Sequence, residues 1–240
     1  MTDSGELRIW LGWRKPDVQA GGSGWDAFMR QLRQRFIPAT WRVMPRFGLT
    51  AYVPSVLRPQ GDGLPDEVAL LAYTSRPAYA AHKQDPLGKA YSEMHDEVFS
   101  FAAGAAKSRS LWAERDTTLI GRPRRRSAAT GEAVFNQAHA RVHFLALHGG
   151  PSPGPEALMA ALQSLTGEVV VWCEPSYSLV WLASGQELAR ADVHALLLPL
   201  MPGASIRAWH AAHMVSSLPD TGVDLPEDSS LHFAEPGSWA

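Results

Sequence analysis

A chain of 240 residues fits one large domain or two small ones, and a 45% share of apolar residues is typical of a globular protein with a buried core. The net charge of −2 gives no general attraction to nucleic acid or to an anionic membrane, and the single cysteine excludes an internal disulfide and a cysteine-based metal cluster. The segment MTDSGELRIW does not resemble a signal peptide, and no apolar run approaches the roughly 20 residues that cross a bilayer. We therefore expect a cytoplasmic protein with neither a nucleic-acid nor a membrane partner.

The first half of the chain follows the order strand, helix, strand, strand, helix, strand. Apolar residues alternate over 6–14, as in a strand. They then recur at helical spacing from Trp25 to Phe36, and Pro38 is expected to end that helix. The remaining elements predicted here are strands at 49–57 and 67–73, the second of them read as fully apolar, a short helix through Lys83, a longer helix over 86–99 and a strand at 110–114.

The second half repeats this order in a shorter version. Its predicted elements are a strand at 140–148, a helix at 156–165, strands at 168–173 and 178–183, a helix at 186–200 and a strand at 205–213. Two copies of the order predict an α+β protein with two ferredoxin-like (βαββαβ) repeats, at 6–115 and 139–215. Residues 116–138 contain Arg122 and Arg124–Arg126 but little periodicity, which predicts an exposed arginine-rich linker. Residues 216–240 are expected to form a polar tail.

One part of the first repeat resembles the dimeric α/β-barrel superfamily. The similar residues are YTSRPAY at 73–79, His82, the Asp85-Pro86 break, LGKAY at 87–91 and His95, together with the closing strand SLWAE at 110–114. The resemblance covers 6–115, and it extends over 139–215 by element order alone. The superfamily includes antibiotic-biosynthesis monooxygenases and other cofactor-free monooxygenases, polyketide cyclases, muconolactone-isomerase-like enzymes, EthD-like proteins and haem-binding branches, and no subfamily is matched.

The resemblance implies that two sheets pair into a barrel, here within one chain, and that each sheet keeps a cavity beneath its own helices. It further implies a small-molecule enzyme with its pocket in the first repeat. We expect acid/base chemistry without a cofactor, namely cyclisation, isomerisation or cofactor-free oxygenation, on an aromatic or polyketide-like substrate. The second repeat would be the pairing partner, which gives a monomer with an internal pseudo-dimer and the option of a further homodimer. The alternative is a non-catalytic ligand-binding or interaction protein with a scaffold barrel.

His95 and Tyr91 are the candidate catalytic residues. His95 follows Tyr91 by four residues and precedes Val98 by three, so it lies on or beside the buried stripe of its helix. An imidazole titrates near neutral pH and can exchange a proton with a bound phenol or enol. The phenol of Tyr91, one turn away, is the expected hydrogen-bonding partner. The alternative is that His95 is a hydrogen-bonded core residue.

Five further residues are candidates for substrate binding. Arg76 precedes a proline at a helix start and is expected to hold an anion, with a solvated arginine as the alternative. Trp10, Tyr52 and Trp112 lie on strands and would supply flat walls, unless they pack between the sheets. His82 is assigned to the pocket as a ligand contact, with a surface position as the alternative.

A metal or haem site is a third possibility, carried by histidines of the second repeat. His143 and His210 lie on its first and last strands, which would be neighbours in a ferredoxin-like sheet. No HxH, HExxH or histidine-carboxylate spacing supports such a site, so no cofactor and no metal are expected. Cys173 lies in an apolar strand and is expected to be an inert thiol.

Overall fold

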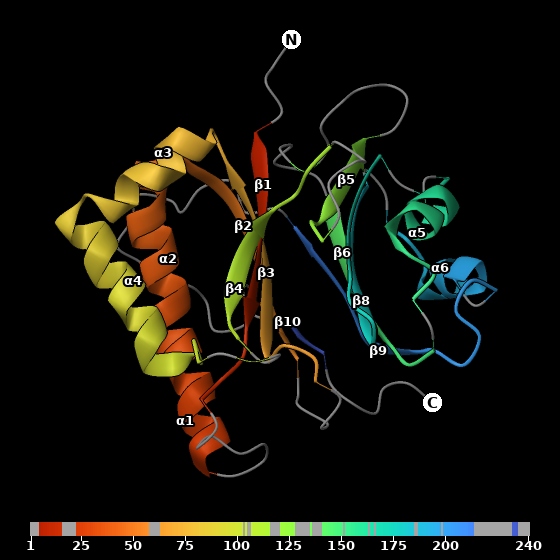
Figure 1. Ribbon diagram of the computed structural model, residues 1–240, viewed down its shortest axis with the longest axis horizontal. Coiled ribbons are helices and arrows are strands. Elements are labelled where there is room, and N and C mark those ends of the chain that lie inside the picture. Colours follow the sequence, from red (N-terminus) through yellow and green to blue (C-terminus); the bar gives the residue numbers. More distant parts are fainter. Residues whose placement is uncertain are drawn as a thin grey trace. The chain divides into compact units, whose positions relative to one another are not determined.

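The computed structural model (Figure 1) describes residues 5–15, 23–57, 63–102, 104, 107–115, 121–127, 135, 141–150, 152–162, 164–165, 167–184, 187–197, 199–213 and 232–234. Over these residues the fold is α+β, with two antiparallel sheets of five strands each. The chain divides into two compact units, one built mainly on Gly5–Ser110 and the other mainly on Leu111–Met214. We call them the N-terminal and the C-terminal unit. No described helix is both long and apolar enough to cross a membrane.

The N-terminal unit places helices against one sheet. Its strands lie in the order β10-β2-β3-β1-β4, so the first and last strands of the predicted first repeat are neighbours. The elements are β1 (Glu6–Gly12), α1 (Ser23–Gln31), a π-helix (Leu32–Phe36), α2 (Ile37–Val43), a 3₁₀ helix (Met44–Phe47), β2 (Leu49–Leu57), β3 (Glu67–Tyr73), α3 (Arg76–Ala80), a 3₁₀ helix (Ala81–Lys83), α4 (Pro86–Val98) and β4 (Arg109–Trp112), with β10 (His232–Ala234) at the edge.

The register of this sheet decides which side chains face the helices. In β1, Leu7, Ile9 and Leu11 are completely buried on one face, while Arg8 and Trp10 point to the other. Arg8 pairs with Leu71 on β3, and Leu71 pairs with Tyr52 on β2. Cross-strand partners share a face. The row Arg8, Leu71, Tyr52 therefore crosses three strands on the helix side.

The first helical segment does not end at Pro38. It continues through the π-helix into α2, where Pro38 is the second residue. In the wide turn, the N–H of Ile37 donates to the carbonyl of Leu32, five residues earlier. A proline is tolerated there because the wide π-turn has already interrupted the regular ladder of helical hydrogen bonds. The continued helix carries Phe36 and Thr40 into the interior, where both are buried.

The C-terminal unit repeats the strand order. Its elements are β5 (Arg124–Ser127), β6 (Arg141–His148), α5 (Pro155–Leu162), β7 (Glu168–Cys173), β8 (Tyr177–Ser184), α6 (Arg190–Leu197) and β9 (Ser205–His213), and the sheet runs β5-β7-β8-β6-β9. In both sheets, the strands of the predicted repeat lie side by side in the order second, third, first, last. One extra strand lies beside the second strand. This arrangement is compatible with two ferredoxin-like repeats.

The helices of the C-terminal unit pack tightly on its sheet. Leu158, Met159 and Leu162 of α5 and Val193 and Leu197 of α6 are buried in a cluster with apolar strand residues. The strand residues of this cluster are Leu145, Leu147, Val169, Val171, Val180 and Leu182. Branched aliphatic side chains fill the space between helix and sheet at the close-packed density of a protein core.

The prediction of an exposed linker over 116–138 is wrong where β5 forms. This strand pairs antiparallel with β7, and the side chains of Arg124 and Arg125 are buried. The Nε of Arg125 forms an ion pair with Glu168, and both side chains are almost fully buried. A buried guanidinium needs such a partner. The partner lies 43 residues away, so no local pattern could reveal it.

The polar tail predicted over 216–240 also contributes a strand. His232–Ala234 forms β10 beside β2, and the rest of the tail lies outside the described residues.

Helix α4 begins at the Asp85-Pro86 break seen in the sequence. The Oδ1 atom of Asp85 accepts hydrogen bonds from the N–H groups of Leu87 (2.8 Å) and Gly88 (3.3 Å), as an N-cap residue does. Gly88 packs against the backbone of His82, since a Cβ at this position would lie 2.2 Å from the His82 carbonyl oxygen. The glycine therefore allows the preceding 3₁₀ turn to lie on the start of α4.

Replacing Gly88 by alanine is expected to lower the free energy of unfolding by about 1–3 kcal/mol, because the new methyl group meets rigid backbone. Denaturation in urea measures the change, with the exposed neighbour Lys89→Ala as the control. Equal stability of the two variants would contradict the close contact.

Candidate active site

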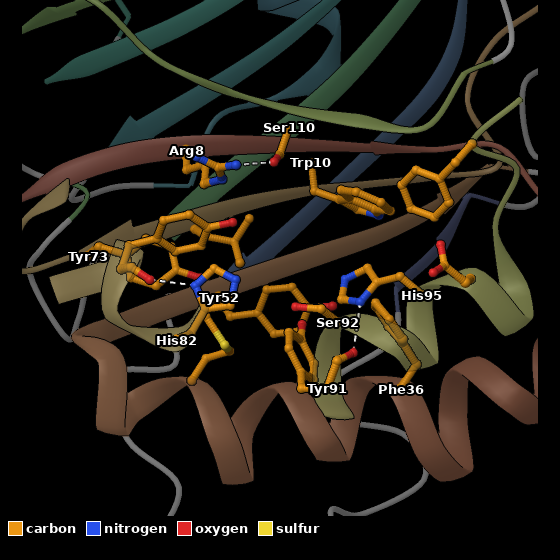
Figure 2. A pocket seen from close by; sticks show the side chains of 15 residues that line it. Arg8, Trp10, Phe36, Tyr52, Tyr73, His82, Tyr91, Ser92, His95 and Ser110 are labelled. Atoms are coloured by element: carbon orange, nitrogen blue, oxygen red, sulfur yellow. Dashed lines mark hydrogen bonds between the residues drawn. The ribbon is translucent and has the colours of Figure 1, made fainter. Parts of the chain in front are cut away.

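An aromatic cavity of about 320 Å³ lies within the N-terminal unit, between the helix-facing side of the sheet and α4 (Figure 2). This volume is at the lower end of the range for small-molecule sites. Seven aromatic side chains line it, namely Trp10, Phe36, Tyr52, Tyr73, Tyr79, Tyr91 and Phe101. Such a lining suits a flat, largely apolar ligand.

His95 faces this cavity from α4 and is surrounded by rings. Its ring centre lies 4.4 Å from that of Phe36, 4.8 Å from that of Tyr91 and 5.1 Å from that of Trp10, all edge to face. Its Nδ1 atom is 3.0 Å from the carbonyl oxygen of Tyr91. Because a carbonyl can only accept, Nδ1 carries the hydrogen and Nε2 is left as an acceptor.

Burial lowers the pKa of His95 to about 4, although the bond to the Tyr91 carbonyl acts in the opposite direction. The imidazole is therefore neutral at physiological pH. Its Nε2 atom can accept a hydrogen bond or a proton from a molecule in the cavity.

The phenol of Tyr91 is bonded to Thr40 and not to His95. The two oxygens are 2.8 Å apart, and the Thr40 hydroxyl also donates to the carbonyl of Phe36 at 3.0 Å. That bond uses the only hydroxyl hydrogen of Thr40, so Tyr91 is the donor between them. Burial raises the pKa of Tyr91, which keeps the phenol protonated. The predicted hydrogen bond between the Tyr91 phenol and His95 is therefore wrong, and His95 bonds instead to the backbone carbonyl of Tyr91.

Glu67 is a buried carboxyl group that the sequence analysis missed. It is completely buried at the start of β3, where its two oxygens accept hydrogen bonds from the indole N–H of Trp10 (3.0 Å) and the phenol of Tyr52 (3.3 Å). Both donors line the cavity. Burial raises the pKa of Glu67 to about 7, because neither donor is charged. An acidic residue in an otherwise apolar strand was the signal available in the sequence.

The raised pKa of Glu67 predicts a loss of stability with rising pH. The ordinary value is 4.5, so between pH 4.5 and about 7 the folded state holds a proton that the unfolded chain has lost. The free energy of unfolding should fall by roughly 3 kcal/mol across this range. Glu67→Gln cannot ionise and should remove this loss. Urea denaturation at pH 4.5 and at pH 8 tests it, and identical pH profiles of variant and wild type would contradict the assignment.

Of the other predicted contacts, Trp10, Tyr52 and His82 line the cavity, whereas Arg76 and Trp112 are not among its lining residues. His82 is only 6% exposed, so the surface alternative is wrong. Its Nδ1 atom is bonded to the carbonyl of Tyr79, and burial lowers its pKa. The structure therefore brings together five of the seven residues singled out by sequence.

The cation at the cavity is Arg8 and not Arg76. The guanidinium of Arg76 pairs with Glu6 at 3.2 Å, and both side chains are 40% exposed. Arg8 lines the cavity, bonds to the hydroxyl of Ser110 and lies over the ring of Tyr79, with its guanidinium carbon 4.1 Å from the ring centre. The alternation of β1, which places Arg8 on the face of Trp10, was the available sequence signal.

The described residues contain no group of three or more His, Cys, Asp or Glu side chains that could hold a metal ion. Strands β6 and β9 are neighbours, but the register pairs His143 with Ala211 and His210 with Phe144. The Nε2 atom of His143 accepts a hydrogen bond from the N–H of Leu188 at 3.1 Å, and the side chain of His210 lies outside the described part.

Cys173 is half-buried, with its Sγ atom 3.5 Å from the hydroxyl oxygen of Ser178. Burial raises the pKa of this thiol, which disfavours the reactive thiolate.

No family model matches the chain, and no curated protein matches it. Among solved structures, it is similar to a proposed monooxygenase from Lactobacillus acidophilus, at 6% identity and a TM-score of 0.41 over 88% of this chain and 95% of that one. A proposed monooxygenase from Fusobacterium nucleatum gives 7% identity and a TM-score of 0.40 over 89% and 97%. A dye-decolorizing peroxidase from Bacteroides thetaiotaomicron gives 10% identity and 0.31 over 88% and 93%. Scores this low do not assign the chain to a family.

Proposed function

We propose that the N-terminal unit is a cofactor-independent enzyme that transfers a proton on a small aromatic or polyketide-like substrate. The proton transfer would start a cyclisation, an isomerisation or an oxygenation. The observation that carries this proposal is His95, a neutral imidazole fixed through Nδ1 with Nε2 facing an aromatic cavity. A general base requires this arrangement, in which one nitrogen is held and the other can accept a proton.

The proposed step is a single proton transfer. The proton of an acidic C–H or O–H of the substrate moves to Nε2, which leaves an enolate or phenolate and an imidazolium. Because the pKa of His95 is about 4, the imidazolium returns its proton readily, to a different atom of the substrate in an isomerisation or cyclisation. A base this weak fits a substrate that is itself acidic, such as a β-dicarbonyl compound or a phenol.

A ligand-binding protein without catalysis is the second candidate. The observation that favours it is the same low pKa, since a weakly basic imidazole also serves as a simple hydrogen-bond acceptor in a binding site. The two candidates differ in one measurable property, because only the enzyme accelerates exchange of a ligand hydrogen with solvent.

Benzoylacetone, an aromatic β-diketone, is a suitable probe. In deuterated buffer, loss of its methylene proton signal in the NMR spectrum reports proton abstraction from carbon. The enzyme proposal expects exchange faster than with the same concentration of free imidazole, and oxygen consumption under air would identify the oxygenation branch. Binding without acceleration would favour the ligand-binding candidate, and the absence of both would overturn the proposal.

We further propose that the repeats at 6–115 and 139–215 pair through their sheets into an intramolecular α/β barrel, which makes the chain an internal pseudo-dimer. The strand order shared by the two sheets supports this proposal. The pocket does not depend on it, because all of its lining residues belong to the N-terminal unit.

A further inference from the structure

Arg8 brings a positive charge to the wall of the aromatic cavity. It lies on β1 two residues before Trp10, which corresponds to a separation of about 7 Å along a strand. Figure 2 shows Arg8 and His95 on opposite sides of the pocket, with the aromatic side chains between and around them. The cavity therefore combines a cation at one side with a proton acceptor at the other.

The guanidinium of Arg8 is held in position by its neighbours. The ring of Tyr79 stacks against it at 4.1 Å, and the Ser110 hydroxyl accepts a hydrogen bond from one of its NH₂ groups. Two contacts of this kind restrict a side chain that is otherwise flexible. A restricted guanidinium loses less conformational entropy when it binds a ligand.

The surroundings of Arg8 favour an anion. Burial has the largest effect on the pKa of its guanidinium, which it lowers, and the phenols of Tyr79 and Tyr73 and the cation Arg76 are among the groups that act on it electrostatically. Burial of a cation costs free energy that a bound anion would offset. The lining carboxylate, Asp96, is exposed and belongs to α4, the helix that carries His95.

We propose that the substrate of this pocket is a planar aromatic or enolic carboxylic acid, with its carboxylate on Arg8 and its acidic hydrogen at His95. The inference rests on the proposed function and names the substrate class for the same cavity. A carboxylate matches the planar fork of a guanidinium and can accept two parallel hydrogen bonds from it. The ring system then lies among the aromatic side chains, and the distance between the two polar ends selects ligands by length.

The test compares 2-naphthoate with 2-naphthamide, which have nearly the same shape and differ in charge. Their affinities for the full chain are measured at neutral pH by isothermal titration calorimetry. Wild type should bind the acid at least about tenfold more tightly than the amide, as expected for charge-assisted hydrogen bonds. Arg8→Gln should abolish this preference and leave the affinity for the amide nearly unchanged.

Two further variants keep the result interpretable. Arg35→Gln removes the same charge from an exposed position and should retain the preference of the wild type. Arg8→Lys keeps the charge without the planar fork and should retain part of the preference for the acid over the amide. If Arg8→Gln fails to fold, Arg8→Lys takes its place in the comparison.

Equal affinity for acid and amide in the wild type, or an unchanged preference in Arg8→Gln, would overturn the assignment of Arg8 while the aromatic pocket stands. Binding of neither compound would overturn the pocket itself, and with it both proposals.

Discussion

Replacing His95 by glutamine is expected to slow the hydrogen exchange of benzoylacetone by at least about 100-fold, the range typical for loss of a general base. Glutamine retains a hydrogen-bonding amide, but it cannot take up a proton at any accessible pH. Thermal unfolding of the variant is measured beside the rate, because the imidazole also packs edge to face on Phe36, Tyr91 and Trp10 and the comparison requires a folded variant. The initial rate of exchange by NMR is the measurement.

The matched control is His194→Gln, which changes an exposed histidine of α6 in the C-terminal unit and should leave the rate unchanged. The pH profile provides a second check. In wild type, the base form of His95 is lost as the pH falls through about 4, so the enzymatic rate should decline there. An exchange rate in His95→Gln equal to that of wild type would remove His95 from the mechanism.

Replacing Glu168 by glutamine is expected to lower the free energy of unfolding by about 3–5 kcal/mol, since it leaves Arg125 as a buried cation without its carboxylate. Glu168 also accepts a hydrogen bond from the N–H of Phe135 at 3.1 Å, which the glutamine oxygen can still accept. The loss therefore reports mainly the charge of the pair. Urea denaturation at neutral pH measures it.

A double variant distinguishes this explanation from a packing defect. Arg125→Met in combination with Glu168→Gln removes both charges and should be more stable than Glu168→Gln alone, because the buried cation is removed together with its carboxylate. If the double variant loses the sum of the two single effects, the pair is not coupled and the ion-pair account is wrong.

The two buried glutamates should therefore respond to the same substitution in opposite ways. Glu168 faces a guanidinium, and its neutral replacement destabilises the fold. Glu67 faces an indole N–H and a phenol, and its neutral replacement stabilises the fold above pH 7. The sign of each effect follows from the charge of the partner and not from the degree of burial.

Patterns of short period predicted the parts of the fold that depend on local structure. The strand predicted over 205–213 coincides with β9, since alternation with period two is a property of neighbouring residues. Helical spacing and the alternation of β1 also selected His95, Tyr91 and Trp10, which the structure places at the cavity.

The features that sequence analysis missed are set by long-range contacts. Arg8 meets a serine 102 positions later, and Arg125 meets a glutamate 43 positions later. Neither spacing leaves a trace in a window of 10 or 20 residues, so β5 was read as part of a linker. The alternation of β1 places Arg8 on the face of Trp10, but it does not show that a cavity borders this face, and Arg76 was chosen instead. Glu67 was overlooked because a single acidic letter does not reveal whether its side chain is buried.

The two additional strands β5 and β10 have a consequence for how the protein behaves at high concentration. They pair with β7 and β2, and they span only four and three residues themselves. A long unpaired edge would offer another copy a template for intermolecular strand addition, whereas a short one offers few N–H and C=O groups in a row. We therefore expect β5 and β10 to offer little backbone for strand addition by another copy of the chain.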